Sequence, residues 1–185
     1  MVGHISTGAS LLHSRVTGLI NTPGSDRVGG VAGMVSALAS PADVLVYHSL
    51  SALTLIKGND SVGGVVGYVS GNNTQKADMF RSRYEGISAE SLLDCLSNCG
   101  GLIGALYNSG HIVNQSYVKN AKVKASGGAT ISVAGLIGFL FNDVTLAISS
   151  SFAKDVTVET TAAAYKAGGL IGENWASGAT YSIND

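Results

Sequence analysis

A short glycine motif recurs five times along the chain and constrains the fold more than any other feature. The copies read "VGGVAG" at 28–33, "VGGVVG" at 62–67, "CGGLIG" at 99–104, "VAGLIG" at 133–138 and "AGGLIG" at 167–172. At the second small residue of each copy, the intervals are 34, 37, 34 and 34 residues. Fixed periods of this length are typical of solenoids, propellers and repeat arrays. A phosphate-binding loop is not indicated, because no Lys-Ser/Thr follows the glycines.

A serine followed by a bulky residue is the second landmark of each repeat, as in "HSRV", "HSLS", "RSRY", "QSYV" and "SSFA". Apolar and polar residues alternate after it, most clearly in "SYVKNAKVKA" and "SFAKDVTVET", and alternation with period two predicts half-buried strands. The repeat landmarks are Ser14, Ser49, Ser82, Ser116 and Ser151, with Gly29, Gly30, Gly33, Gly63, Gly64, Gly67, Gly100, Gly101, Gly104, Gly135, Gly138, Gly168, Gly169 and Gly172.

A coil of roughly 34 residues with three short strands is one rung of a parallel β-solenoid. Equivalent residues of successive rungs lie about 4.8 Å apart and form a column along the solenoid. Each residue of a column must therefore pack against residues of the same kind above and below it. The column Val31/Val65/Leu102/Leu136/Leu170 is expected to form the interior. We expect the flanking glycines to stand where a Cβ would clash, and the serine hydroxyls to bond the backbone or the next serine. The prediction is an all-β chain, a parallel β-helix of about five rungs over residues 1–185.

Composition narrows the possible partners. The chain is 45% hydrophobic and 12% charged, with a formal net charge of −1. Disordered segments combine low hydrophobicity with high net charge, so disorder is not expected. No basic run is present, which argues against nucleic acid, and no apolar run reaches the roughly 18 residues that span a bilayer.

The segment "SAESLLDCLSNCGG" precedes the third glycine motif and reads differently from its counterparts. Leu92, Cys95, Leu96 and Cys99 have helical spacing, which predicts a short helix over about 89–98. Cys95 and Cys99 could form a bridge in an oxidising compartment, but two cysteines four residues apart on a helix are poorly placed for one, so we expect two buried free thiols. A zinc site would need four ligands and no histidine pair accompanies the cysteines.

A few polar and aromatic residues are candidates for chemistry. His13 and His48 share a column, as stacked imidazoles or as a metal pair that lacks a third ligand, and His111 is expected in a loop. Asp26 and Asp60 precede successive glycine motifs, where they either form turns or stand one rung apart as a pair of acids. The aromatic residues Tyr107, Tyr117, Trp175 and Tyr181 either stack structurally or form platforms for a sugar or protein partner, and Lys119 and Lys154 share a solvated column.

Residues 99–124 ("CGGLIGALYNSGHIVNQSYVKNAKVK") and 167–185 ("AGGLIGENWASGATYSIND") carry a family resemblance. Their Gly-Gly-Leu-Ile-Gly signature, serine-aromatic turn and alternating strand are similar to the GLUG-motif repeats of large bacterial or protist surface proteins. The first two repeats depart from that signature, having valine for leucine. The resemblance implies a right-handed β-helix in surface or secreted proteins, including adhesins and regions beside protease domains, and it brings no catalytic residues with it.

We therefore predict a structural or adhesive repeat module of a secreted or cell-surface protein, cut from a longer array and not an enzyme. We assign no catalytic, cofactor-binding or metal-binding residue. The expected partner is a protein or glycan at a surface, or a second copy through open solenoid ends, whose unpaired strand edges favour association. The alternative is a polysaccharide-processing or glycan-binding β-helix.

Overall fold

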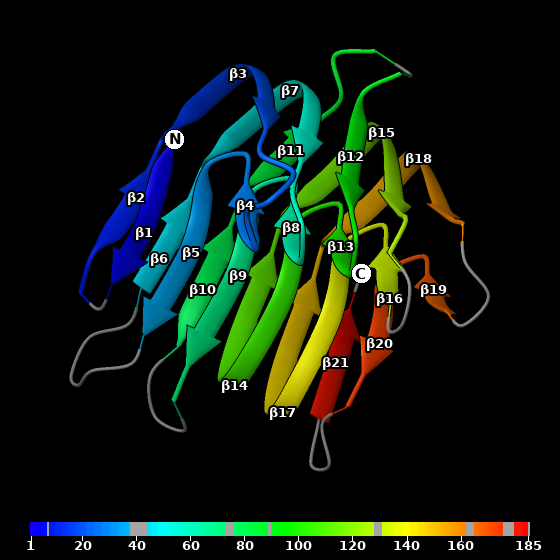
Figure 1. Cartoon of the computed structure of the whole chain (residues 1–185). Helices are drawn as coiled ribbons and strands as arrows, with labels where there is room; N and C mark the ends of the chain where they lie inside the picture. The colour runs from blue at the N-terminus through cyan, green and yellow to red at the C-terminus, as the bar shows by residue number, and fades with distance from the viewer. Residues whose placement is uncertain are drawn as a thin grey trace.

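The chain is a parallel β-solenoid of about four turns, each near 34 residues long. The computed structural model describes residues 1–6, 8–37, 44–72, 76–88, 90–127, 131–161, 165–175 and 180–184. These residues form strands and turns and contain no helix. Figure 1 shows the strands of successive turns lying side by side, from blue at one end of the stack to orange at the other. The five glycine motifs bound four complete turns, which accounts for the difference from the five rungs expected.

Three parallel sheets form the walls of the solenoid, and each turn contributes strands to all three (Figure 1). The first sheet contains β1 (Val2–Ser6), β2 (Ser10–Leu12), β5 (Ala32–Ala37), β6 (Val44–Tyr47), β9 (Val66–Gly71), β10 (Ala77–Phe80), β14 (Ile103–Asn114), β17 (Ile137–Ser149), β20 (Ile171–Asn174) and β21 (Thr180–Asn184). The second contains β3 (Arg15–Asn21), β7 (Leu50–Lys57), β11 (Arg83–Glu85), β12 (Leu92–Cys95), β15 (Tyr117–Ala125) and β18 (Phe152–Thr160). The third contains β4 (Arg27–Gly29), β8 (Ser61–Gly63), β13 (Asn98–Gly100), β16 (Ile131–Ala134) and β19 (Tyr165–Gly168).

The aliphatic column of the glycine motifs forms part of the interior, as the sequence predicts. Val31, Val65, Leu102 and Leu136 are at most 1% exposed, and Leu170 packs against the same core. Their backbones also bond turn to turn, with N···O distances of 2.9 Å from Val31 to Val65 and 2.8 Å from Leu102 to Leu136. Like residues therefore both fill the core and continue the hydrogen-bond ladder.

Four of the five glycines in the column stand close to the backbone of the next turn, and Gly169, in the last motif, has no atom within 4 Å of an added Cβ. A Cβ on Gly64 would lie 2.0 Å from the carbonyl oxygen of Gly101, and one on Gly101 would lie 2.1 Å from that of Gly135. Among the described glycines only Gly8 and Gly18 have positive φ. Lack of space, and not backbone freedom, therefore requires glycine in this column.

The repeat serines form a hydrogen-bonded ladder along one corner of the solenoid. The backbone N–H of Ser82 donates to Ser116 Oγ, and the N–H of Ser116 donates to Ser151 Oγ, both at 3.1 Å. Each hydroxyl in turn donates to the carbonyl two residues earlier, at 3.0 Å from Ser116 to Asn114. Ser49, Ser82 and Ser116 are fully buried. The ladder satisfies backbone N–H groups that the sheets leave unpaired at this corner.

The residue before each ladder serine adopts a left-handed backbone conformation. The φ angles lie between 47° and 54°, at His13, His48, Arg81, Gln115 and Ser150. Positive φ is uncommon outside glycine and asparagine, and here it recurs once per turn. A left-handed residue therefore marks, in every turn, the corner just before the serine that bonds the next turn.

The helix expected over 89–98 is absent, and that prediction was wrong. Leu92–Cys95 forms β12, which pairs in parallel with β7 and β15, and Asn98–Gly100 forms β13. Leu93 enters the core at 0% exposure, whereas Leu96, which a helix would bury, is 46% exposed. The segment lies between strands of the neighbouring turns, so their backbone groups set its conformation and override its helical pattern. Ala89 lies outside the described residues.

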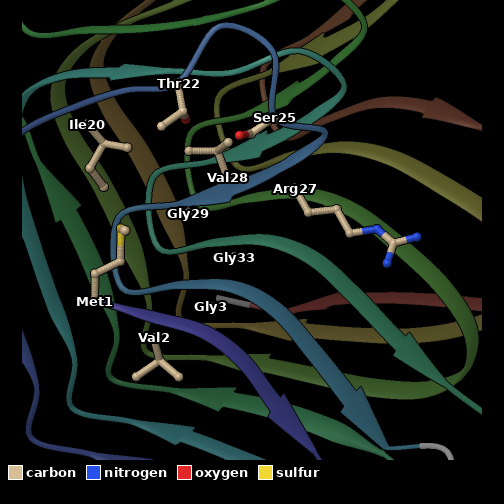
Figure 2. A pocket seen from close by; sticks show the side chains of 10 residues that line it. All are labelled: Met1, Val2, Gly3, Ile20, Thr22, Ser25, Arg27, Val28, Gly29 and Gly33. Atoms are coloured by element: carbon tan, nitrogen blue, oxygen red, sulfur yellow. The ribbon is translucent and has the colours of Figure 1, made fainter.

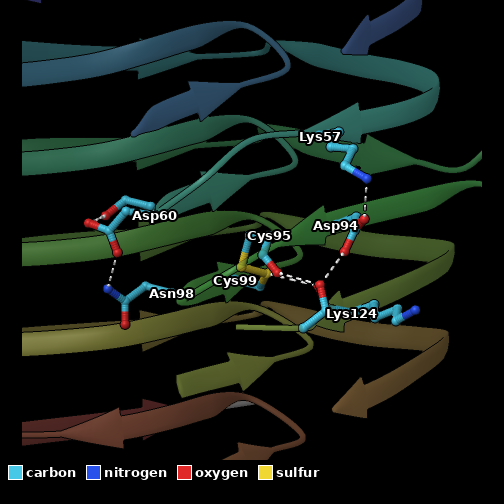
Figure 3. Close-up of a disulfide and its surroundings, with 9 residues drawn as sticks. Lys57, Asp60, Asp94, Cys95, Asn98, Cys99 and Lys124 are labelled. Atoms are coloured by element: carbon cyan, nitrogen blue, oxygen red, sulfur yellow. Dashed lines mark hydrogen bonds and ion pairs between the residues drawn. A yellow bond between two sulfur atoms is a disulfide. The ribbon is translucent and has the colours of Figure 1, made fainter. Parts of the chain in front are cut away.

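The two cysteines form a disulfide, which corrects the expectation of free thiols (Figure 3). Cys95 ends β12 and Cys99 lies in β13, so the bridge closes the corner between the second and third sheets. The Cα atoms are 6.0 Å apart, within the range that a disulfide spans, because the corner turns the two residues toward one another. Both residues are at most 1% exposed, so the bridge is part of the core.

Candidate functional site

A polar depression of about 460 Å³ lies on the outside of the solenoid, between the third sheet and the first. Its lining consists of two carboxylates, one guanidinium and two phenols, from Asp26, Arg27, Asp60, Tyr68 and Tyr107. Arg27 lies in β4, Tyr68 in β9 and Tyr107 in β14, while Asp26 and Asp60 directly precede β4 and the Ser61 that starts β8. The depression therefore draws on three successive turns.

The repeat places the two aspartates in one column. Arg27 pairs with Ser61 in the third sheet, and the N–H of Ser61 donates to the Asp26 carbonyl at 2.7 Å. Asp26 and Asp60 are therefore one rung apart, a backbone separation of about 4.8 Å. The sequence predicted this stacking as one of two alternatives.

Amides of the following turn hold both carboxylates. Asn59 Nδ2 donates to Asp26 Oδ1 at 2.6 Å, and Asn98 Nδ2 donates to Asp60 Oδ1 at 2.8 Å (Figure 3). The Ser61 hydroxyl donates to the second oxygen of Asp60 at 3.2 Å. The carboxylates are thus fixed in orientation as hydrogen-bond acceptors, with Asp26 exposed and Asp60 half-buried.

The tyrosines form the other wall of the depression. The Arg27 guanidinium lies 4.4 Å from the centre of the Tyr68 ring, and the Tyr68 and Tyr107 ring centres are 4.7 Å apart. Tyr68 is therefore contacted from the turn before it and the turn after it, by a cation–π contact and a tilted aromatic pair. The stack continues from Tyr107 to Phe141 at 4.9 Å.

The Tyr107 hydroxyl is held in its protonated form. Burial raises the pKa of Tyr107 above its usual value, the Tyr68 phenol and the Asp60 carboxylate raise it further, and Arg27 opposes them. At neutral pH the depression therefore combines a phenolic O–H that can donate or accept with carboxylates that accept and a guanidinium that donates.

A second depression, of about 390 Å³, lies on the second sheet. Tyr117 and Phe152 stack there with ring centres 5.0 Å apart and planes 2° from parallel, and the Tyr117 hydroxyl donates to Glu85. Lys119 and Lys154 pair across β15 and β18, in the shared column that the sequence predicts, and line the same depression. Its single phenol is already engaged by a carboxylate.

The histidines are placed differently from one another. His13 and His48 lie side by side, exposed, with Nδ1 atoms 3.3 Å apart. His111, expected in a loop, is instead part of β14 and only 2% exposed, so that expectation was wrong. Its Nε2 lies 2.8 Å from the Asn108 carbonyl oxygen and its Nδ1 3.2 Å from that of Ala77. Within the described residues, no three His, Cys, Asp or Glu side chains are grouped to hold a metal ion.

An apolar hollow of about 120 Å³ lies in the first turn (Figure 2). Met1, Ile20 and Val28 line it, and Ile20 and Val28 belong to the hydrophobic core. In Figure 2 the Arg27 side chain points away from Met1 and Ile20. Its lining also includes Thr22, Ser25 and Arg27, and the Thr22 hydroxyl already donates to the Lys57 carbonyl at 3.1 Å.

Tyr68 is the part of the candidate site that sequence reasoning missed. It lies four residues after Gly64, and Tyr107 lies six residues after Gly101. Both offsets are even, so both side chains leave the same face of the first sheet. Counting from the glycine landmark would have placed them together. Trp175, at offset six in the last repeat, is 53% exposed and contacts Phe139, while the Tyr181 side chain lies outside the described residues.

Comparison of the chain with protein-family models, with curated proteins and with solved structures finds no significant match. In the part of the chain that the structure describes, no helix is long and apolar enough to cross a membrane.

Proposed function

We propose that the chain is a structural and adhesive repeat module of a secreted or cell-surface protein. The observation that carries this proposal is that the repeated residues all make contacts between turns. The glycine column, the serine ladder and the aliphatic column all serve the contact between turns. A stack stabilised in this way holds its outward side chains at a regular spacing, which suits a rigid surface for binding another molecule.

The disulfide supports the proposed location. Cys95 and Cys99 are joined inside the core, and disulfides persist mainly in secreted, periplasmic and cell-surface proteins. The similarity to GLUG-motif repeats points the same way, because it implies large surface proteins.

An adhesion assay tests this function. Beads coated with the oxidised, folded chain are incubated with immobilised polysaccharides, extracellular-matrix proteins and cell monolayers. We expect saturable attachment to at least one surface. Beads coated with the heat-unfolded chain serve as the control, and attachment should require the folded chain. Folded beads that attach to nothing in the panel, or attach no better than the control, contradict the proposal.

The second candidate is a polysaccharide-processing β-helix. It is favoured by one observation, that Asp26 and Asp60 lie one rung apart in the same depression. Retaining glycosidases place their two carboxyl groups about 5–5.5 Å apart, which a one-rung column permits. Turnover of a polysaccharide that disappears in both Asp26→Asn and Asp60→Asn supports this candidate, and inactivity over a broad polysaccharide panel counts against it.

A further inference from the structure

We propose that the depression lined by Asp26, Arg27, Asp60, Tyr68 and Tyr107 binds a linear neutral polysaccharide made of hexose units. This inference rests on the proposed adhesive function and names the ligand class and the site. The five residues come from three turns and meet only because the chain is wound as a solenoid.

The hydrogen-bonding groups of the depression fit a polyhydroxylated ligand. Sugar hydroxyls donate and accept, and the depression offers both kinds of partner, with acceptors at Asp26 and Asp60 and a donor at Arg27. Asn59 and Asn98 orient the carboxylates before any ligand arrives, which reduces the entropy lost on binding.

The aromatic wall supplies apolar ring edges beside the hydrogen-bonding groups, because the ring faces are already packed against Arg27, one another and Phe141. Tyr68 and Tyr107 are half-buried, with rings 4.7 Å apart. Tyrosine offers an apolar ring and a polar hydroxyl at one place, which suits a ligand whose C–H groups and hydroxyls alternate. The contact of Arg27 with Tyr68 and of Tyr68 with Tyr107 fixes the rings, so little side-chain freedom is lost on binding.

The repeat distance favours an extended chain over a single sugar. Successive turns are about 4.8 Å apart, close to the length of one pyranose unit in an extended glycan. Asp26 and Asp60 repeat at this spacing along the solenoid axis, and Tyr68 and Tyr107 come from adjacent turns of the same sheet. A polymer lying along the axis would therefore meet a carboxylate at two successive units and one tyrosine from each of two adjacent turns.

The local charge favours a neutral sugar over an acidic one. Two carboxylates and one guanidinium line the depression, so an added uronate carboxylate would meet net repulsion. The second depression has the opposite character, because Lys119 and Lys154 line it, and its Tyr117 hydroxyl is committed to Glu85. Because of this contrast, a substitution in the second depression serves as a control for the same substitution in the first.

Titration calorimetry of the full chain tests the site. The probes are the hexasaccharides of β-1,4-glucose, β-1,4-mannose and α-1,4-galacturonate. We expect at least one neutral hexasaccharide to bind at least tenfold more tightly than the galacturonate. Asp26→Asn, an isosteric change at an exposed residue, should weaken that binding at least fivefold. Tyr107→Phe should weaken it similarly, whereas Tyr117→Phe, the same chemical change in the second depression, should leave it within twofold.

Circular dichroism and thermal melting of each variant ensure that folded proteins are compared. Galacturonate binding as tight as that of the neutral probes overturns the neutral class. Equal affinities for wild type, Asp26→Asn and Tyr117→Phe overturn the site, as does binding of none of the three probes. If the folded chain still attaches in the bead assay while the site fails here, the adhesive function stands without this ligand. If both fail, the function itself is wrong.

Discussion

At the scale of single residues, the ladder serines connect backbone groups that no strand can pair. Ser116 is fully buried, accepts from the Ser82 N–H at 3.1 Å and donates to the Asn114 carbonyl at 3.0 Å. The Asn114 carbonyl keeps a second partner, the Arg81 N–H at 2.9 Å. Loss of the Ser116 hydroxyl therefore leaves one buried donor, the Ser82 N–H, without a partner.

Ser116→Ala should lower the free energy of unfolding by about 1–3 kcal/mol, the usual cost of a buried unpaired polar group. Urea unfolding followed by circular dichroism measures the change. Ser14→Ala is the matched control, because the Ser14 hydroxyl donates only to the Leu12 carbonyl, at 3.3 Å, in an exposed setting. Equal losses in the two variants would show that the buried rungs of the ladder contribute nothing.

Burial of His111 makes stability depend on pH. Burial lowers the pKa of His111, and hydrogen bonds to backbone carbonyls only partly oppose that effect. In the unfolded chain a histidine titrates near pH 6.5, so below that pH the unfolded state binds a proton that the folded state does not. Stability should therefore fall as the pH drops below about 6.5.

Urea unfolding at pH 8, 7, 6 and 5 measures this dependence, and the informative quantity is the slope of the unfolding free energy against pH below pH 6.5. His111→Gln should flatten this slope, whatever the substitution does to the unfolding free energy at pH 8. His48→Asn, at an exposed position with positive φ that asparagine tolerates, should leave the slope as in the wild type. A wild-type slope that persists in His111→Gln would assign the effect to other groups.

Residue types predicted the stacking columns well, but they did not predict the left-handed corner. The residues with positive φ before the serines include Arg81, Gln115 and Ser150, none of which indicates such a conformation by its type. Likewise nothing local predicts that His111 is buried, since its place in β14 depends on pairing with β10 and β17. These properties come from neighbouring turns and not from adjacent residues.

At the scale of strands and corners, the glycine column sets how closely turns approach. Gly101→Ala would place a Cβ 2.1 Å from the Gly135 carbonyl oxygen, which is backbone and cannot move aside cheaply. We expect a loss of about 1–3 kcal/mol or more, as for other overpacked sites, visible as a lower melting temperature. Gly24→Ala is the control, because no atom lies within 4 Å of its added Cβ, and it should be neutral or slightly stabilising. Similar melting temperatures for both variants would contradict the close approach.

The corner between β12 and β13 shows why local pattern misled the sequence interpretation. Helical spacing of Leu92, Cys95 and Leu96 competes there with strands on both sides, and pairing with β7 and β15 prevails. The same corner brings Cys95 and Cys99 together, which a helix would not do. The strand and the disulfide were therefore missed for one reason, the tertiary setting of the segment.

The disulfide should stabilise the fold modestly. It closes a loop of only five residues, for which chain entropy gives about 2 kcal/mol. Reductant should lower the unfolding free energy of the wild type by about that amount and leave Cys95→Ser/Cys99→Ser unchanged. Alkylation under denaturing conditions without reductant, followed by mass measurement, checks the bridge directly. Uptake of two labels would contradict it.

At the scale of the whole molecule, the 34-residue period was sufficient to predict the architecture. Periodicity reports the contact that each turn makes with the next, so it predicted parallel stacking and the interior column, and it gave the stacked aspartates as one of two alternatives. It did not predict the depression, because that site depends on side chains that individual turns carry between the repeated landmarks. The repeat does not predict the partner either, because every turn carries the same landmarks whichever molecule the surface binds.

The strongest test of the repeat is to remove one period. Deletion of residues 102–135 joins Gly101 to Leu136, restores "CGGLIG" at the junction and leaves Ser82 and Ser151 at the 35-residue spacing that Ser116 and Ser151 have now. The shortened chain should fold cooperatively with β-rich circular dichroism, because each turn contacts only its neighbours. Small-angle scattering should show an elongated particle about 4.8 Å shorter than the wild type.

Deletion of residues 102–118, half a period, joins Gly101 to Lys119 and places a lysine where the core needs an aliphatic side chain, so that chain should not fold. If the two deletions behave alike, stacking of equivalent turns does not determine this fold.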